Sequence, residues 1–188
     1  MSMDSGLSGK VAIVTGGSRG IGRAIVTLLA SEGVDVTFFY RENAAAAAEV
    51  VAAATAGNGN SVGKTVGKII GKIAALQVDI RDSQACAAAV EEVAARCGRI
   101  DILVNNAGTI RDNQLAAMDD DDVKIVLDTN IGGVFNMVRA VAPHMIMQRG
   151  GKALYNGTPN PPAAAGDDGH SAAQTGLICF WAVHPEMQ

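Results

Sequence analysis

The chain alternates short, wholly apolar runs with longer segments in which apolar residues recur every three or four positions. The first run, Val11–Thr15, is β-branched and apolar, which is typical of a strand buried on both faces of a sheet. From Gly20 the apolar residues follow helical spacing as far as Gly33, a residue type that often follows a helix end. A second apolar run over 34–40 starts the same order again. The pattern therefore predicts an α/β fold.

The alternation of strand and helix continues further along the chain. We expect three more strands, at 73–78, 101–104 and 152–155, and further helices over 43–56, 82–97 and from the acidic run 119–122 to about residue 148. Asn43 is a suitable N-cap for the first of these helices. Carboxylates at a helix N-terminus interact favourably with the helix dipole, so the acidic run needs no functional explanation. Repeated strand-helix units predict a doubly wound parallel sheet with helices on both faces and a ligand at the carboxyl ends of its strands.

Two segments depart from this pattern. Residues 57–72 contain three Gly-Lys steps, which predicts an inserted surface loop. Part of this segment, 59–65, is one residue short of a P-loop and follows a helix, so we expect no phosphate site there. After Gly150 the pattern decays, because 156–169 is rich in Gly, Pro and Asp, and only 170–183 regains a helix-like spacing. We interpret 1–188 as a single domain.

Composition narrows the function classes. Fifteen basic and nineteen acidic residues give a net charge of -4 without any basic run, so nucleic acid is not an expected partner. Three cysteines without a C-x-x-C pair predict neither a zinc site nor a disulfide framework, which fits the reducing cytoplasm. The N-terminus has no apolar signal segment, and no run approaches the roughly 18 apolar residues of a membrane span. We therefore expect a cytoplasmic protein without membrane association or a metal.

A glycine-rich turn joins the first strand to the first helix. Its glycines, Gly16, Gly20 and Gly22, follow the spacing G-x-x-x-G-x-G. A turn in this position can present backbone N–H groups and a helix N-terminus to a pyrophosphate. Glycines alone would also suit an ordinary strand-helix turn, so the interpretation depends on further motifs.

With those motifs, residues 7–150 resemble the short-chain dehydrogenase/reductase family, and the bacterial 3-oxoacyl-[acyl-carrier-protein] reductases most closely. Asp79 matches the family's adenine-binding aspartate, the run 105–108 matches its NNAG motif, and Asn130 matches the asparagine of its catalytic tetrad. The resemblance implies a Rossmann-like fold, a nicotinamide dinucleotide cofactor and a small-molecule carbonyl or acyl thioester substrate. It also implies a homo-oligomer, since relatives dimerise through the helices that correspond to 119–148 and 170–183.

The expected cofactor-binding residues come from the glycine turn and from the ends of three strands. They are Gly16, Gly17, Ser18, Arg19, Gly20, Ile21, Gly22, Tyr40, Arg41, Asp79, Ile80, Asn106, Ala107 and Gly108. Arg41 and Arg19 stand where NAD-binding proteins prefer a carboxylate, which favours the 2′-phosphate of NADP. Glu42 could offset Arg41, and Arg41 could also be a solvated loop residue, so NAD stays open as the alternative.

The catalytic residues of the family are altered. The family's Tyr-x-x-x-Lys motif is absent, and the matching segment 170–178 carries His170 and Gln174 at the two positions. Thr158, twelve residues before His170, stands at the position of the family's serine. The expected catalytic positions are therefore Asn130, Thr158, His170 and Gln174, of which the last two are substituted.

Two functions remain open after this comparison of motifs. One is an NADPH-dependent reductase of a carbonyl substrate, and the other is an impaired or inactive dinucleotide-binding pseudoenzyme. The resemblance also implies a C-terminally shortened domain whose sheet stops at its fifth strand and leaves an uncovered edge.

Overall fold

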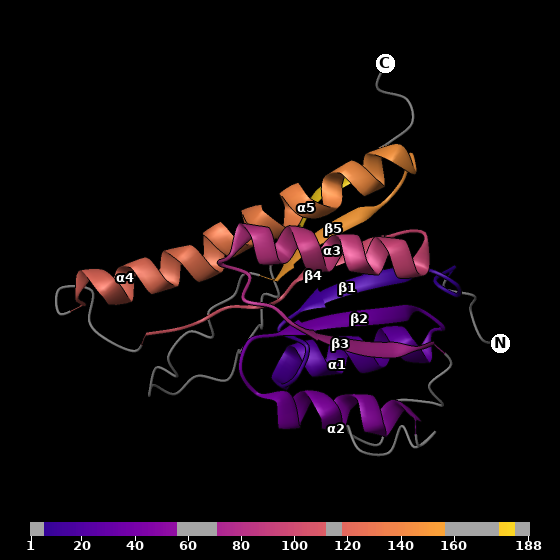
Figure 1. The fold of residues 1–188 in the computed structure, drawn as a ribbon, viewed down its shortest axis with the longest axis horizontal. Coiled ribbons are helices and arrows are strands. Elements are labelled where there is room, and N and C mark those ends of the chain that lie inside the picture. Colours follow the sequence, from indigo (N-terminus) through magenta and orange to yellow (C-terminus); the bar gives the residue numbers. More distant parts are fainter. Residues whose placement is uncertain (1–5, 56–70, 112–117, 157–176, 183–188) are drawn as a thin grey trace, which may run out of the picture.

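The computed structural model describes residues 6–55, 71–111, 118–156 and 177–182 and contains one six-stranded sheet. The strands are β1 (Val11–Thr15), β2 (Asp35–Tyr40), β3 (Ile73–Gln77), β4 (Ile102–Asn105), β5 (Lys152–Asn156) and β6 (Leu177–Ala182). The helices are α1 (Gly20–Ser31), α2 (Ala44–Thr55), α3 (Ser83–Cys97), α4 (Asp120–Leu127) and α5 (Gly133–Met147), with a π-helical turn at Asp128–Gly132. Figure 1 shows this arrangement.

The strand order is β3-β2-β1-β4-β5-β6, and the first five strands are parallel. β1 pairs on one side with β2, where Ile13 lies opposite Thr37, and on the other side with β4, where Ile13 lies opposite Leu103. The chain thus builds the sheet outward in two directions from β1, which confirms the predicted doubly wound Rossmann-like fold.

Both faces of the sheet are buried, as the continuous apolar strands predicted. On one face, Ile13 belongs to the same core as Val90 of α3 and Met137 of α5. On the other face, the neighbouring Val14 belongs to a core with Val26 of α1. Side chains alternate between the two faces of a strand, so α1 and α2 cover one side while α3 and α5 cover the other (Figure 1).

The helix ends are capped by nearby residues, as the sequence predicted for Asn43. The side chain of Asn43 accepts a hydrogen bond of 2.9 Å from the backbone N–H of Ala46 at the start of α2. Asp82 caps α3 in the same way, and Gly98 follows α3 with a left-handed φ of 73°. These caps satisfy backbone groups that a helix end leaves without intrahelical partners.

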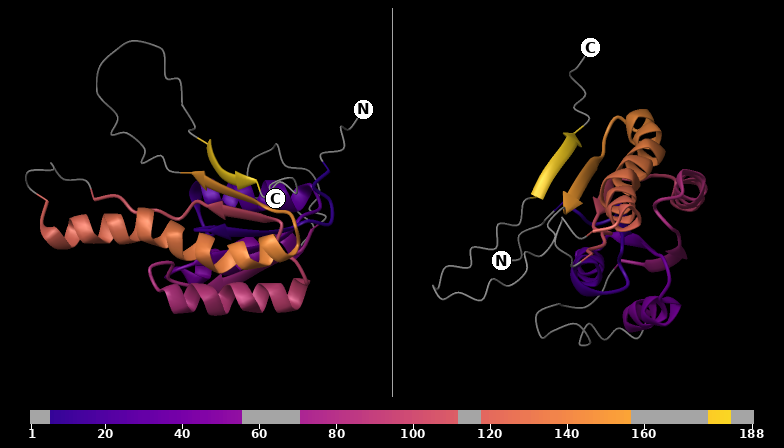
Figure 2. Two further views of the ribbon diagram at one scale, coloured as in Figure 1. Left: turned by 90° about the horizontal axis from the view of Figure 1, so that it is seen from above. Right: turned by 90° about the vertical axis from the view of Figure 1, so that its left-hand side faces the viewer.

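The long helix expected over 119–148 is present but is not uniform. α4, the π-helical turn and α5 follow one another without a break and form one long rod (Figure 2). The π-helical turn, which the sequence did not predict, contains Asn130. Such turns accommodate one extra residue in a helix and often occur at functional sites.

The C-terminal prediction was wrong for the residues that the structure describes. Residues 177–182, expected within a helix over 170–183, form strand β6, which pairs antiparallel with β5. The run is apolar and contains Ile178, Phe180 and Trp181, residue types that favour strands, and the edge of β5 offers unpaired backbone groups. β5 is therefore not the uncovered edge that we expected.

The expected insertion lies mostly outside the described residues, which resume at Gly71. Its last two residues are bonded to α1 and to the start of β2, because the N–H of Gly71 donates to the carbonyl of Ala30 over 2.9 Å and that of Lys72 donates to Asp35 Oδ1 over 2.8 Å. Within the described ranges no helix is long and apolar enough to cross a membrane, and no cluster of three or more His, Cys, Asp or Glu is placed to hold a metal.

Candidate functional site

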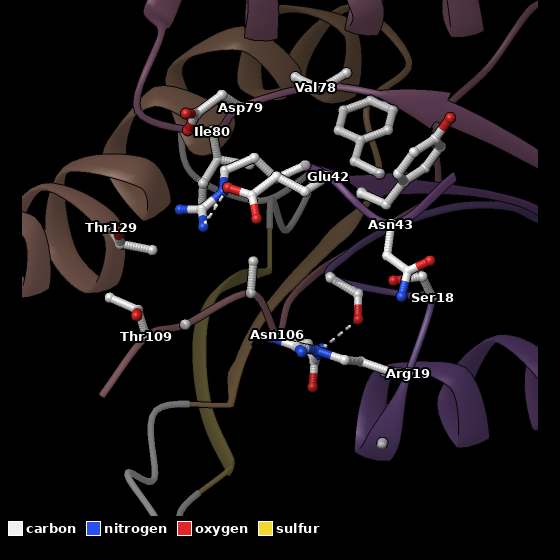
Figure 3. A pocket seen from close by; sticks show the side chains of 18 of the residues that line it. Ser18, Arg19, Glu42, Asn43, Val78, Asp79, Ile80, Asn106, Thr109 and Thr129 are labelled. Atoms are coloured by element: carbon white, nitrogen blue, oxygen red, sulfur yellow. Dashed lines mark hydrogen bonds and ion pairs between the residues drawn. The ribbon is translucent and has the colours of Figure 1, made fainter. Parts of the chain in front are cut away.

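A cavity of about 380 Å³ lies at the carboxyl ends of β1, β2 and β4 (Figure 3). Every predicted cofactor-binding residue except Gly17 lines it. Six further residues line it that the sequence analysis did not predict to bind a cofactor: Phe39, Glu42, Asn43, Val78, Thr109 and Thr129. Parallel strands end at the same edge of a sheet, so motifs far apart in sequence meet there.

The first half of the glycine turn is fixed to β2. The N–H groups of Gly16 and Gly17 both donate to the carbonyl of Phe39, over 2.8 and 3.2 Å. Gly16 has a left-handed φ of 69°. A Cβ atom on Gly17 would overlap the side chain of Phe38, so Gly17 serves the packing of the turn on the sheet.

The start of the turn is also fixed to the segment after β4, by Asn106. Its Nδ2 donates to the carbonyls of Thr15 and Gly16, over 3.0 and 3.2 Å. The hydroxyl oxygen of Thr15 accepts the N–H groups of Asn106 and Ala107, both over 3.0 Å. A Cβ atom on Gly22 would overlap the carbonyl oxygen of Gly16 and Asn106 Nδ2. This close approach explains why glycine stands at position 22.

The N-terminus of α1 opens into the cavity. Its N-cap, Arg19, has an extended backbone and makes no side-chain capping bond, and the first turn contains no acidic residue. The first hydrogen bond of the helix runs from the N–H of Arg23 to the carbonyl of Arg19, over 3.1 Å. The preceding N–H groups, at residues 20–22, have no acceptor within the helix and carry the positive end of its dipole. This arrangement fits a diphosphate group.

Two cationic side chains border the cavity near the end of β2. Arg41 forms an ion pair of 2.7 Å with Glu42, and their side chains are 44% and 75% exposed. Exposed pairs of this kind contribute little free energy, so Arg41 can exchange Glu42 for an anionic ligand. Arg19 lines the cavity from the glycine turn.

Asp79 lies beyond the end of β3 and is engaged by Arg81. The Nε atom of Arg81 donates to both carboxylate oxygens over 3.0 and 3.1 Å, and its backbone N–H donates to Oδ1 over 3.0 Å. The side-chain hydrogen bond from Arg81 is the main reason that the pKa of Asp79 lies below its ordinary value. Asp79 is therefore a hydrogen-bond acceptor at neutral pH.

Asn130 connects the π-helical turn to the loop after β4. Its Oδ1 accepts the N–H of Thr109 over 2.8 Å, and its Nδ2 donates to the carbonyl of Thr109 over 3.0 Å. A Cβ atom on Gly108 would lie 3.3 Å from Asn130 Oδ1, so the loop passes close to this side chain. Asn130 thereby positions the part of the cavity wall formed by Gly108 and Thr109.

The other three expected catalytic positions, Thr158, His170 and Gln174, lie outside the described residues. The structure thus brings together the expected cofactor-binding residues and Asn130. Thr109 and Thr129 are two of the cavity residues that sequence reasoning missed. Both could have been found from their position next to recognised motifs, since Thr109 follows the run 105–108 and Thr129 precedes Asn130.

Comparison with known proteins identifies the class. The model of the short chain dehydrogenase family matches residues 10–155, and the chain belongs to this family. Among its relatives, the 3-oxoacyl-[acyl-carrier-protein] reductase FabG of Vibrio harveyi is 36% identical over 175 residues, which cover 93% of this chain and 65% of the relative. The FabG of Staphylococcus aureus is 38% identical over 145 residues, covering 77% of this chain and 54% of the relative. The chain thus spans between about half and two thirds of the length of these curated relatives.

Solved structures agree with this assignment. A short chain dehydrogenase from Burkholderia cenocepacia in complex with NADP superposes with a TM-score of 0.64 at 40% identity, covering 73% of this chain and 51% of that one. A metagenomic short-chain oxidoreductase in complex with NADP gives 0.65 at 34% identity, covering 80% of this chain and 63% of that one.

Proposed function

We propose that the cavity binds NADPH. The observation that carries the proposal is the convergence on one cavity of the open N-terminus of α1, the cations Arg19 and Arg41, the ionised Asp79 and the backbone of residues 106–108. The two structural relatives described with NADP support it. NAD is the alternative cofactor, and the ion pair of Arg41 with Glu42 is the feature that would favour it.

Each part of the dinucleotide has a counterpart among these residues. The N–H groups of residues 20–22 would hold the diphosphate, and Arg19 and Arg41 would hold the 2′-phosphate. Asp79 and Ile80 would border the adenine. When bound, the reduced cofactor supplies a hydride for a carbonyl carbon.

We further propose that catalysis is impaired. In the family a tyrosine delivers the proton to the carbonyl oxygen and a lysine lowers the pKa of that tyrosine. His170 is shorter than tyrosine, and Gln174 carries no charge that could change a neighbouring pKa. A positioned acid or base contributes about 10²- to 10⁴-fold to a rate, so the chain would turn over at least that much more slowly than an intact relative.

An active reductase of a 3-oxoacyl thioester, or of a similar small carbonyl compound, is the second candidate function. The names of the FabG relatives favour this substrate class. Thr158 retains the hydroxyl that could orient a carbonyl group, and Asn130 is held at the cavity. An active reductase would require His170 to donate the proton in place of tyrosine.

We also propose self-association through the long helix. Leu127, Ile131 and Phe135 are spaced four residues apart and are 50%, 51% and 64% exposed, so they form an apolar stripe on one helix face. Light scattering after gel filtration should show an oligomer that Phe135→Glu shifts toward monomer, whereas Gln84→Glu, at an exposed position of α3, should not. A monomeric wild type would contradict this proposal.

A fluorescence titration tests cofactor binding. The wild type should bind NADPH saturably and more tightly than NADH. Arg19→Gln should weaken NADPH binding about tenfold, because it removes a charge from an anionic ligand. Arg139→Gln, outside the cavity lining, is the matched control and should leave the dissociation constant unchanged. Equal or tighter binding of NADH would contradict the preference for NADP, and no binding of either would contradict the proposed function.

A further inference from the structure

Helix α5 is bonded at each end to a loop of the sheet through one amide side chain. Near its start, Asn136 Nδ2 donates to the carbonyls of Ile80 and Arg81, over 2.9 and 3.2 Å. At its other end, Gln148 Nε2 donates to the carbonyl of Ile100 over 2.8 Å. The two amides form similar bonds, but Ile80 lines the cavity, whereas Ile100 lies before β4 at the opposite end of the sheet.

The loop that Asn136 holds carries two residues of the cavity wall. Asp79 and Ile80 both line the cavity, and Ile80 is 6% exposed. Arg81 fixes the carboxylate of Asp79, because its backbone N–H and its Nε both donate to Oδ1 over 3.0 Å. The position of the Arg81 backbone therefore determines where the carboxylate of Asp79 lies.

The same helix also supports the loop through an apolar contact. A Cβ atom on Gly133, three residues before Asn136, would overlap the side chain of Ile80, so this side chain packs directly on the helix backbone. Cys86 of α3 adds a weaker contact, since its Sγ lies 3.4 Å from the carbonyl oxygen of Ile80. The loop is thus held between α3 and α5, and Asn136 supplies N–H donors from the α5 side.

Loss of the Asn136 amide would loosen the loop where it borders the cavity. The bond to the carbonyl of Ile80 is partly buried, and the bond to the carbonyl of Arg81 is exposed. A partly buried carbonyl that loses its donor costs free energy, which the loop can reduce by moving outward until water reaches the carbonyl. Such a movement would take Ile80 and Asp79 away from their places in the cavity wall.

We infer that Asn136 is a positioning residue for cofactor binding. It is not among the residues that line the cavity, and it acts through the backbone of Ile80 and Arg81, which in turn places Asp79. This inference rests on the proposed function, since it assumes that a nicotinamide dinucleotide occupies the cavity. It assigns to α5 a role in keeping the cofactor cavity in shape.

The test compares Asn136→Leu, which removes the amide at similar size, with Asn136→Gln, which keeps a donor. NADPH and NADH are titrated by fluorescence at a temperature at which each variant is folded. Asn136→Leu should weaken binding of both cofactors by a similar factor of about three to ten, because it acts away from the 2′-phosphate that distinguishes them. The dissociation constants of Asn136→Gln should lie between those of Asn136→Leu and the wild type.

Gln148→Leu is the matched control. It removes an amide that donates to the carbonyl of Ile100 and also accepts the N–H of Ile100 over 2.7 Å, away from the cavity. Thermal unfolding should show a melting temperature lowered at least as much as in Asn136→Leu, whereas cofactor dissociation constants should stay within about twofold of the wild type. A purely structural role for Asn136 predicts instead that the loss of binding follows the loss of stability in both variants. Should Asn136→Leu fail to fold, Asn136→Ala replaces it in the same comparison.

The possible outcomes separate this inference from the proposed function. A wild type that binds either cofactor and an Asn136→Leu variant that binds it equally well would overturn the inference alone. Equal losses of binding in Asn136→Leu and Gln148→Leu would also overturn it, as would an Asn136→Gln variant as weak as Asn136→Leu. A loss confined to NADPH would assign the effect to the 2′-phosphate and contradict the inference as well. A wild type that binds neither cofactor would overturn both proposals.

Discussion

The region from β1 to β4 and the region after β5 differ in how their motif residues are arranged. In the first region the strands are parallel, and the loops that follow them converge on one cavity that the backbone largely builds. In the second, β6 returns antiparallel to β5, and three of the expected catalytic positions, which carry Thr, His and Gln, fall between the two strands. Under the proposed function, cofactor binding would depend on the sheet and its turns, whereas catalysis would depend on a few side chains.

The largest expected effect comes from returning the family's catalytic residue types to positions 170 and 174. The double substitution His170→Tyr and Gln174→Lys should raise the rate of NADPH oxidation with an acetoacetyl thioester by about 10²- to 10⁴-fold, because it returns the proton donor and its charged neighbour. NADPH binding should change much less. The measurement is the absorbance decay of NADPH at saturating cofactor.

Each single substitution is the control for this prediction. His170→Tyr alone should recover only part of the rate, since Gln174 cannot lower the pKa of the new tyrosine. A double variant that binds NADPH but stays at the wild-type rate would show that more than these two side chains separates the chain from an active reductase.

The second-largest expected effect concerns the region from β1 to β4, whose cavity is built largely by backbone atoms. Gly22→Ala would place a Cβ atom against the carbonyl oxygen of Gly16 and Asn106 Nδ2, and neither atom belongs to a long side chain that can move aside. We expect it to lower the free energy of unfolding by about 1–3 kcal/mol and to abolish most NADPH binding. Gly150→Ala is the matched control, because nothing lies within 4 Å of a Cβ atom there. Urea unfolding at equilibrium measures both, and an unchanged Gly22→Ala variant would refute the role assigned to this glycine.

The next prediction concerns Asp101, which lies just before β4 at the end of the sheet opposite the cavity. Its carboxylate accepts the N–H of Val11 over 2.9 Å and is paired with Arg99 and Lys10, while its backbone carbonyl accepts the N–H of Lys152 over 2.8 Å. Burial alone would raise the pKa of Asp101, but the hydrogen bonds from Arg99 and Val11 and the nearby charges hold it below its ordinary value. The ionised form therefore stabilises the fold.

Because the folded-state pKa is lowered, this stabilisation is fully present above the unfolded pKa of about 3.9 and is lost as the pH falls through the folded value. Asp101→Asn should cost about 2 kcal/mol of unfolding free energy at pH 7 and less near pH 3. Urea unfolding at the two pH values measures this difference, with the exposed Asp120→Asn as control. An equal loss at both pH values would argue against a role for the charge.

The smallest expected effect concerns the choice of cofactor. Arg41→Ala should weaken NADPH binding about three- to tenfold and leave NADH binding nearly unchanged, because it removes a partner of the 2′-phosphate. Glu42→Gln should tighten NADPH binding slightly, since it frees Arg41 from its ion pair. Fluorescence titrations with the two cofactors provide the measurement. A loss of NADH affinity equal to that of NADPH would show that Arg41 does not read the phosphate.

Sequence reasoning predicted the first region well because local signals determine it. The apolar strand Val11–Thr15 and the cap at Asn43 each depend on residues close in sequence, and the structure contains both. The cavity followed from topology, since residues at the ends of parallel strands meet.

The remaining features depend on tertiary contacts that sequence periodicity does not report. Leu177–Ala182 has an apolar composition that suits either a helix or a strand, and pairing with the edge of β5 decides for the strand. The π-helical turn Asp128–Gly132 has no distinguishing composition, so the spacing of apolar residues does not predict it.

The most direct test of the central claim measures binding and turnover in one sample of the wild-type chain. NADPH is first titrated by its fluorescence, and an acetoacetyl thioester is then added to the saturated protein. The account predicts saturable binding followed by NADPH oxidation at least about 10²-fold slower than that of an intact FabG relative assayed in parallel. A chain that does not bind NADPH, or one that oxidises it as fast as the relative, would contradict the account.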